Sequence, residues 1–317
     1  MTNLHDRGEG AAWTVEPLAF QLRSPLHIGW RKVGNLMQTR PYVPARNLWG
    51  ALTAALTRAE AAQAGRAAAP EDYNQMGRRV AESLAFTYLF PALTADPAQA
   101  LYPWLTAGGL VYGEEGLAAE RFDYLCLDSY ASTAIVAGQN SAETGSLHET
   151  EMIRPRTRPL GGATDEWGAP LYLVGYVLVR GEGPAGWRTA LRRLQIGGER
   201  RYGWGALRQV ETPPQPGNAL FGRYHLSEAT TPRPVLEART RGPLLAHTLA
   251  TDFNRAARLA GVSGPVEPVV GRETRIDERP GFGAKLLAAR ICWAPGATLD
   301  QGQRVAVGED GIWRGAV

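Results

Sequence analysis

Leu194-Gln-Ile-Gly-Gly-Glu-Arg-Arg-Tyr-Gly-Trp-Gly-Ala-Leu-Arg208 is a glycine-rich segment between an expected helix and an expected strand. Glycine has no Cβ, so its backbone adopts positive φ angles and comes close to a ligand. Successive backbone N–H groups in such a turn form a concave site for anions. Two arginines and two aromatic rings add charge and stacking surfaces. Phosphate and base together indicate single-stranded nucleic acid as the ligand. The candidate contacts are Gly197, Gly198, Arg200, Arg201, Tyr202, Gly203, Trp204 and Gly205.

Regular elements are expected on both sides of the glycine-rich segment. Residues 171–179 form a near-continuous apolar run, which is typical of a central strand. A helix is expected over residues 185–195, because three large apolar side chains share one face, and residues 206–210 predict a final strand. Near the start of the chain, alternating apolar residues predict a first strand over 13–22.

The next part of the chain predicts a loop and two helices. Residues 30–44 are expected to be a loop. Asn47 is expected to cap the first helix, which has leucines at four-residue spacing, and a second helix is expected over 73–89. Residues 91–170 show no sustained period, apart from short strand-like pieces at 110–112 and 124–127. This stretch is interpreted as an insertion that wraps the core.

The order of these elements predicts the fold class. Strand, helix, insertion, strand, helix, glycine-rich loop and strand make an α+β, ferredoxin-like (RRM-like) βαββαβ core with one strand inside the insertion. The predicted domains are residues 1–211, with the insertion at about 65–170, and a second α+β part over residues 219–317. That second part is expected to hold a helix at 244–259 and strands at 286–293, 304–307 and 312–313.

The composition excludes several classes of protein. With 21% charged and 44% hydrophobic residues, the chain is an ordinary globular one. Cys126 and Cys292 are the only cysteines, which excludes a disulfide framework or a cysteine zinc site. No apolar run is long enough to span a membrane and no signal peptide is recognised, so a cytoplasmic protein without a membrane partner is expected.

The positive charge is concentrated in two segments. Residues 17–59 hold six basic residues and no acid, and residues 188–208 hold six arginines and one glutamate. The net charge of the whole chain is only +3, so the remainder is strongly acidic. Such a distribution indicates a polyanionic partner.

Two motifs resemble those of the RAMP superfamily of CRISPR proteins. Ser24-Pro-Leu-His-Ile-Gly29, a basic loop and Tyr42-Val-Pro-Ala-Arg-Asn-Leu-Trp-Gly-Ala-Leu52 resemble the N-terminal signature of this family. Gly197-Gly-Glu-Arg-Arg-Tyr-Gly-Trp-Gly205 resembles its glycine-rich loop. The resemblance covers residues 13–60 and 171–210. It implies an antiviral ribonucleoprotein subunit that contacts the guide RNA (crRNA) backbone.

The same resemblance suggests which subunit this is. Backbone subunits that slice target RNA carry an aspartate in the loop after the His-Ile-Gly motif, and residues 30–44 contain no acid. The chain is more similar to the type III (Csm/Cmr-like) subunit that holds the 5′ handle of the guide. Its implied partners are the large cyclase-type subunit and the backbone RAMP subunits. The further candidate RNA contacts are His27, Arg31, Lys32, Arg40, Arg46, Arg154 and Arg156.

Catalysis is the main alternative to a scaffold role. Some relatives cleave repeat RNA with histidine and no metal, and His27 could act as a general base or acid on a 2′-hydroxyl. A backbone RAMP subunit is the other alternative. His148-Glu-Thr-Glu151 lacks the second histidine of a zinc motif. Neither a Walker lysine nor a Gly-x-Ser-x-Gly motif occurs, so no metal, cofactor or hydrolase chemistry is expected.

Overall fold

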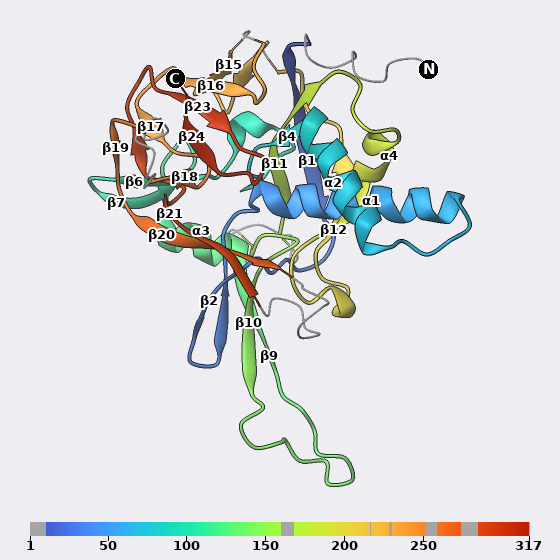
Figure 1. Cartoon of the computed structure of the whole chain (residues 1–317). Helices are drawn as coiled ribbons and strands as arrows, with labels where there is room; N and C mark the ends of the chain where they lie inside the picture. Colours follow the sequence, from blue (N-terminus) through green and yellow to red (C-terminus); the bar gives the residue numbers. More distant parts are fainter. Residues whose placement is uncertain are drawn as a thin grey trace.

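The computed structural model describes residues 11–159, 168–215, 217–227, 230–250, 259–273 and 285–316. The fold is a mixed α+β one in which strands outnumber helices, as expected for the α+β class (Figure 1). None of the helices in the described ranges is long and apolar enough to span a membrane. The expected helix over 244–259 is wrong for residues 244–250, and residues 251–258 lie outside the described part.

A central antiparallel sheet organises the N-terminal part. Its strand order is β12-β13-β1-β11-β4, and β5 also pairs with β11. As the apolar run predicts, β11 is central, and residues 173–179 are all buried. Strands β4 and β5 come from the stretch expected to be an insertion. The bounds are β1 (Trp13–Leu22), β4 (Leu84–Phe86), β5 (Phe90–Ala92), β11 (Tyr172–Arg180), β12 (Arg193–Gln195) and β13 (Ala206–Val210).

Helices cover one face of this sheet. They are α1 (Ala45–Gln63), α2 (Pro70–Ser83) and α4 (Trp187–Leu191). Arg188 of α4 forms an ion pair with Glu16 of β1. The buried residues Leu18 and Phe20 lie two and four positions further along the same strand. Side chains two residues apart in a strand share a face, so the helices lie on the Leu18 face.

Strands of the C-terminal part cover the opposite face. Tyr176 of β11 accepts a hydrogen bond from the backbone N–H of Phe221 at its hydroxyl, and the two rings meet edge-on with centroids 4.9 Å apart. The strands are β14 (Ala219–Leu220), β15 (Tyr224–Leu226), β16 (Val235–Ala238), β17 (Gly242–Pro243), β18 (Thr248–Leu249), β19 (Val262–Ser263), β20 (Val266–Glu273), β21 (Lys285–Trp293), β22 (Thr298–Leu299), β23 (Arg304–Val307) and β24 (Trp313–Gly315). Eight of them form one sheet, β14-β15-β16-β23-β24-β18-β21-β20.

Two hairpins project from the body of the protein, and the β9–β10 hairpin reaches furthest (Figure 1). They pair in a four-stranded sheet of order β2-β3-β10-β9. Their strands are β2 (Gly29–Val33), β3 (Leu36–Thr39), β9 (Leu127–Ser132) and β10 (His148–Ile153). Helix α3 (Ala119–Cys126) contacts β9 and also packs against the small sheet of β6 (Pro103–Thr106), β7 (Gly109–Tyr112) and β8 (Leu117–Ala118).

Several expected element bounds are wrong. Residues 30–44 are not a plain loop, because Gly34 and Asn35 form a two-residue turn that joins β2 to β3. The second helix ends at Ser83, since residues 84–86 pair with β11. The helix before the glycine-rich loop ends at Leu191, because residues 193–195 pair with β13.

Three further expectations fail for similar reasons. Helix α1 begins at Ala45, directly after Pro44, and the backbone N–H of Asn47 bonds to the Pro44 carbonyl, so Asn47 is not the cap. Residues 124–126 are helical, and the strand begins at Leu127. The buried segment from Leu244 exchanges two backbone hydrogen bonds with residues 296–297, and these tertiary contacts override its helical spacing.

Candidate nucleic-acid interface

The two motifs singled out in the sequence are joined by backbone hydrogen bonds. The N–H of Gly198 donates to the carbonyl of His27 over 2.9 Å, and the N–H of Gly205 donates to the carbonyl of Pro25 over 2.7 Å. Gly197, the residue before Gly198, has a φ of +82°, and a Cβ there would lie 2.4 Å from the His27 oxygen. The glycine-rich loop and the Ser24–Gly29 segment therefore form one structure, which we call the glycine junction.

The loop is also held from within. The N–H of Ile196 bonds to the carbonyl of Gly205 over 3.0 Å, and a Cβ on Gly205 would lie 1.8 Å from the Ile196 oxygen. The side-chain amide of Gln195 donates to the carbonyls of Arg200 and Trp204. Backbone groups and one glutamine thus set the loop shape, and the side chains at its tip take no part.

The tip of the loop, a short 3-10 turn over Arg200–Tyr202, carries its side chains outward. The guanidinium groups of Arg200 and Arg201 are exposed and make no hydrogen bond or ion pair with any described residue. The Tyr202 side chain is 81% exposed. An exposed aromatic ring beside two exposed guanidinium groups has the chemistry that phosphate and base require.

Two open hollows flank the loop tip, and both are lined in part by Glu199 and Tyr202. The first, of about 660 Å³, is otherwise lined by Arg58, Gln195, Gly197, Gly198, Arg200 and Arg201. The second, of about 580 Å³, is otherwise lined by Tyr130, Ser132, Thr133, Ala134, His148, Thr150 and Trp204. The first is cationic, and the second combines aromatic rings with hydroxyl groups and one imidazole.

Trp204 lies on the aromatic side of the loop. Its ring meets that of Tyr130 edge-on, with centroids 6.4 Å apart. Tyr130 belongs to β9 and is 59% exposed. The projecting hairpin therefore supplies part of the wall beside the loop.

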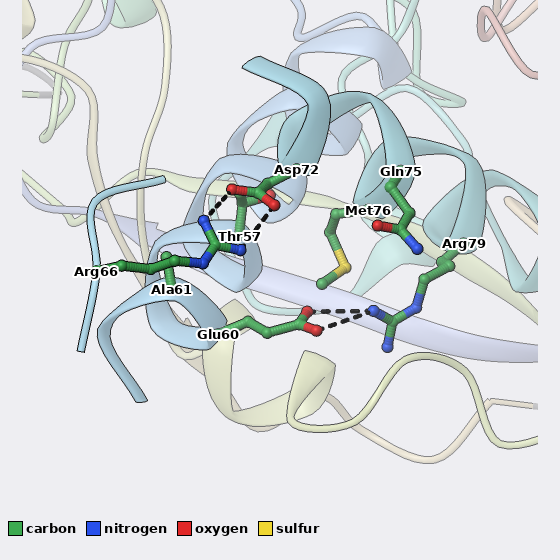
Figure 2. Close-up of a pocket in the computed structure, with 8 residues that line it drawn as sticks. All are labelled: Thr57, Glu60, Ala61, Arg66, Asp72, Gln75, Met76 and Arg79. Carbon is green, nitrogen blue, oxygen red and sulfur yellow. Dashed lines mark hydrogen bonds and ion pairs between the residues drawn. The ribbon is translucent and has the colours of Figure 1, made fainter. Parts of the chain in front are cut away.

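A third hollow, between α1 and α2, is neutralised from within (Figure 2). Arg66 forms a two-pronged ion pair with Asp72, and Arg79 pairs with Glu60 over 3.1 Å. The hydrogen bond from Arg66 lowers the pKa of Asp72 to about 2. Each arginine already has a carboxylate partner, so the charged groups of this hollow stabilise the packing of α1 and α2 and do not form an anion site.

His27 is buried beneath the loop. The residue is only 8% exposed, and its Nδ1 lies 2.7 Å from the carbonyl oxygen of Glu151 in β10. A carbonyl only accepts, so Nδ1 carries the proton and donates. The imidazole thus ties the glycine junction to the projecting hairpin.

The other predicted contacts are not all near the loop. Arg31 and Lys32 are exposed on β2, and Arg31 stacks on Trp30 at 4.1 Å. Arg40 points inward and forms an ion pair with Glu267 over 2.7 Å. It also donates to the Tyr42 hydroxyl.

Three more predicted contacts already have partners within the protein. Arg46 lies over the ring of Trp49, at 3.8 Å from its centroid. Arg154 is paired with Asp128, and Arg156 donates to the Gly168 carbonyl over 2.6 Å. Burial lowers the pKa of Arg46, with Asp310 and Glu309 acting in the opposite direction.

Residues that the sequence did not select also line the hollows. Arg58 of α1 joins Arg200 and Arg201, and Tyr130 and Ser132 of β9 join Trp204. Arg58 lies in the acid-free basic segment, which was a signal for it, whereas nothing local marks Tyr130. Within the described ranges, no group of three His, Cys, Asp or Glu residues is placed to hold a metal ion.

Comparison with known proteins places this arrangement in a known fold. No protein-family model matches the sequence, and no curated protein matches it. Among solved structures, a chain of the type III-B Cmr-beta complex bound to cognate target RNA and AMPPnP is similar, with a TM-score of 0.50 and 11% identity. The match covers 89% of this chain and 85% of that chain.

A chain of the same complex bound to cognate target RNA gives a TM-score of 0.51 at 10% identity, over 89% of this chain and 86% of that one. The chain has the fold of a type III-B CRISPR effector subunit. This fold agrees with the type III resemblance seen in the sequence. Each of the two matches covers 89% of this chain.

Proposed function

We propose that this chain is a non-catalytic RNA-binding scaffold subunit of a type III-like CRISPR effector complex and that it holds the 5′ handle of the guide RNA. The glycine junction carries the proposal. Two segments that the sequence separates widely are bonded backbone to backbone at Gly198 and Gly205, which presents Arg200, Arg201 and Tyr202 to solvent. Such a loop is preorganised, so little conformational entropy is lost when RNA binds.

The topology of the central sheet supports the predicted ferredoxin-like fold of the domain that carries the loop. Strands β13, β1, β11 and β4 lie in that order and are antiparallel throughout. Helices α1 and α2 connect β1 to β4, and α4 lies between β11 and β13. A βαββαβ unit has this order when each helix connects two strands that flank a third.

The chemistry of the loop supports RNA as the ligand. Single-stranded RNA is bound by cationic grooves together with aromatic faces on which bases stack. Arg58, Arg200 and Arg201 line one hollow, and Tyr202 separates it from the aromatic hollow. The two similar Cmr-beta structures contain cognate target RNA. We therefore assign guide RNA and other effector subunits, including a large cyclase-type subunit and backbone subunits, as the partners.

The position of His27 favours a scaffold over a repeat endoribonuclease. A general base must reach the proton that it removes, at about 2.6–3.2 Å. His27 is buried, and one of its two nitrogens is engaged by the Glu151 carbonyl. Its carbonyl is at the same time the acceptor for Gly198. A structural role accounts for each of these contacts.

Purification of the assembled complex tests the proposal. The full chain is co-expressed with the other subunits and a CRISPR array, and the bound RNA is sequenced. One copy of the chain per complex, with bound RNA of a single defined 5′ end, is expected. Several copies per guide would instead establish a backbone subunit.

A second assay addresses catalysis directly. The pure full chain is incubated with repeat RNA in EDTA, and no cleavage is expected. Cleavage that disappears in His27→Ala would overturn the scaffold proposal.

A further inference from the structure

The face of the central sheet opposite the helices is only partly covered. Ala19 and Tyr176 lie on that face, and both are buried where the C-terminal strands pack. Toward the β12 edge the covering ends. Gln21 is half-buried there, and Arg23, Arg193 and Arg208 are exposed. We call this uncovered region the arginine face.

The pairing register gathers these side chains. Gln21 lies directly opposite Arg208, and Arg208 lies directly opposite Arg193. Arg23 is two residues beyond Gln21 in the chain and therefore shares its face. Three arginines and one glutamine, from β1, β13, β12 and the residue after β1, thus lie on one side of the sheet.

Among the residues that the structure describes, no carboxylate forms an ion pair with these three arginines. Arg23 and Arg208 both donate to the same neutral oxygen, Gln21 Oε1, over 3.1 and 3.0 Å. Arg193 makes no side-chain hydrogen bond or ion pair with the part of the chain that the structure describes. Like charges directly opposite in an antiparallel pair are destabilising, so the free protein tolerates a repulsion that an anion would relieve.

The arginine face continues into the glycine junction. Gln195 lies two residues from Arg193 on the same strand face, at a rise of about 7 Å. Its side chain holds the carbonyls of Arg200 and Trp204 at the two ends of the loop tip. Strand β12 therefore links the arginine face directly to the loop tip, so a ligand that extends from the loop along this strand reaches Arg193.

We propose that the arginine face is a second phosphate-binding station, where Arg23, Arg193 and Arg208 bind the phosphodiester backbone of single-stranded RNA that extends from the loop. This inference rests on the RNA-binding part of the proposed function and adds residues outside both predicted motifs. Guanidinium groups bind phosphate oxygens with paired N–H donors. The neighbouring exposed Tyr202 and the loop arginines favour RNA over an acidic protein segment, which offers no base to stack.

The test compares three variants of the full chain with the wild type. Affinity for a labelled single-stranded RNA of about 16 nucleotides is measured between about 50 and 200 mM salt. Arg193→Gln with Arg208→Gln is expected to reduce the slope of log K against log[salt] by about 1.4, which corresponds to two lost phosphate contacts. Its unfolding midpoint is expected to equal or exceed that of the wild type, because a repulsion is removed.

Arg188→Gln is the matched control. Arg188 is an exposed arginine of the same segment, but it lies on the helix face and is paired with Glu16. Its loss is expected to leave the slope unchanged. The control removes one charge and the double variant removes two. A drop in the control at least half as large as that in the double variant would overturn the inference, since net charge alone would then account for both.

The third variant separates this inference from the proposed function. If Arg200→Ala with Arg201→Ala weakens binding while Arg193→Gln with Arg208→Gln has the wild-type slope, the arginine face is overturned and the loop proposal stands. If the wild type binds no RNA, both are overturned. Binding of polyglutamate that is lost in the Arg193/Arg208 variant, with RNA binding intact, would overturn the inference in favour of an acidic protein partner.

Discussion

The backbone N–H of Gly198 donates to the carbonyl oxygen of His27 across 2.9 Å, and this bond joins the glycine-rich loop to the segment between β1 and β2. Gly197, next to it, has no room for a side chain on its inner side. The shape of the loop that we propose to bind RNA is thus coupled to the stability of the domain at this place. Substitutions here and at the loop tip therefore distinguish effects on the fold from effects on RNA binding.

Gly197→Ala is expected to destabilise the protein strongly. A left-handed φ costs a residue with a Cβ about 1–2 kcal/mol, and the clash with the His27 carbonyl adds to that cost. Gly203→Ala is the matched control, because Gly203 has the same φ, +83°, with open space around it. Urea unfolding should show the larger loss for Gly197→Ala. Equal losses would contradict the close contact.

Arg200→Ala with Arg201→Ala should weaken RNA binding without altering the fold. If the chain neutralises about five phosphates, log K falls with log[salt] at a slope near −3.5, or ~100-fold between about 50 and 200 mM. The double variant should lower that slope by about 1.4, with little dependence on base identity. Fluorescence anisotropy at several salt concentrations measures both. A flat salt response of the wild type would remove the electrostatic basis.

Tyr202→Ala should reduce the free energy of RNA binding by about 1–3 kcal/mol, the contribution of one stacked base. Tyr202→Phe retains the ring and should bind as the wild type does. The unfolding midpoint should not change in either variant, because the side chain is 81% exposed. If Tyr202→Phe lost as much affinity as Tyr202→Ala, the hydroxyl and not the ring would be the contact.

Arg40→Met should destabilise the protein by about 3 kcal/mol, since it leaves the largely buried Glu267 without its cation. Removing both charges, in Arg40→Met with Glu267→Gln, should recover part of that loss. RNA affinity, measured well below the unfolding midpoint, should be unchanged in both. A loss of RNA affinity in a variant with wild-type stability would show that Arg40 contacts RNA.

The His247 imidazole should make the stability depend on pH below about 6.5. Burial lowers the pKa of His247, although its hydrogen bond to Glu267 acts in the opposite direction. The neutral ring accepts from the Tyr88 hydroxyl at Nδ1 and donates to Glu267 at Nε2. Since the folded pKa lies below that of the unfolded chain, the unfolded state takes up the proton first, and stability falls as the pH falls through this window.

His247→Gln removes the titrating group and keeps a donor for Glu267. Unfolding midpoints at about pH 7.5 and about pH 5.5 are compared for both proteins. The wild type should lose more stability on acidification than the variant. An identical loss in the two proteins would show that His247 does not titrate in this range.

The sequence predicted the glycine-rich loop better than the charges around it, whereas the backbone bonds that join the loop to residues 25 and 27 were not predicted. Gly197, Gly203 and Gly205 are a local signal, because each has a positive φ, which glycine adopts most easily. Arg40 and Arg154 were counted as free cations, yet their partners, Glu267 and Asp128, lie in other elements. Pairing between distant side chains is a tertiary property that a basic segment cannot reveal.

The element bounds show the same division between local and tertiary signals. The run at 171–179 predicts a buried strand because every residue in it favours one. Residues 193–195 continue a helical pattern but pair with β13, and Leu194 is buried by either arrangement. The Gly34–Asn35 turn was a readable hairpin signal, since such dipeptides between short strands favour a two-residue turn.

The glycine junction is built from main-chain bonds at Gly198 and Gly205, and the side chains at positions 199–202 do not hold it together. Folding therefore places few demands on which amino acids occupy positions 200–202, whereas position 199 adopts a left-handed φ of +52°. Evolution can exchange residues 200–202 and so change what the loop recognises, while the scaffold beneath it is kept. The same independence makes positions 200–202 a site for combinatorial libraries in which new ligand preferences are selected on a stable frame.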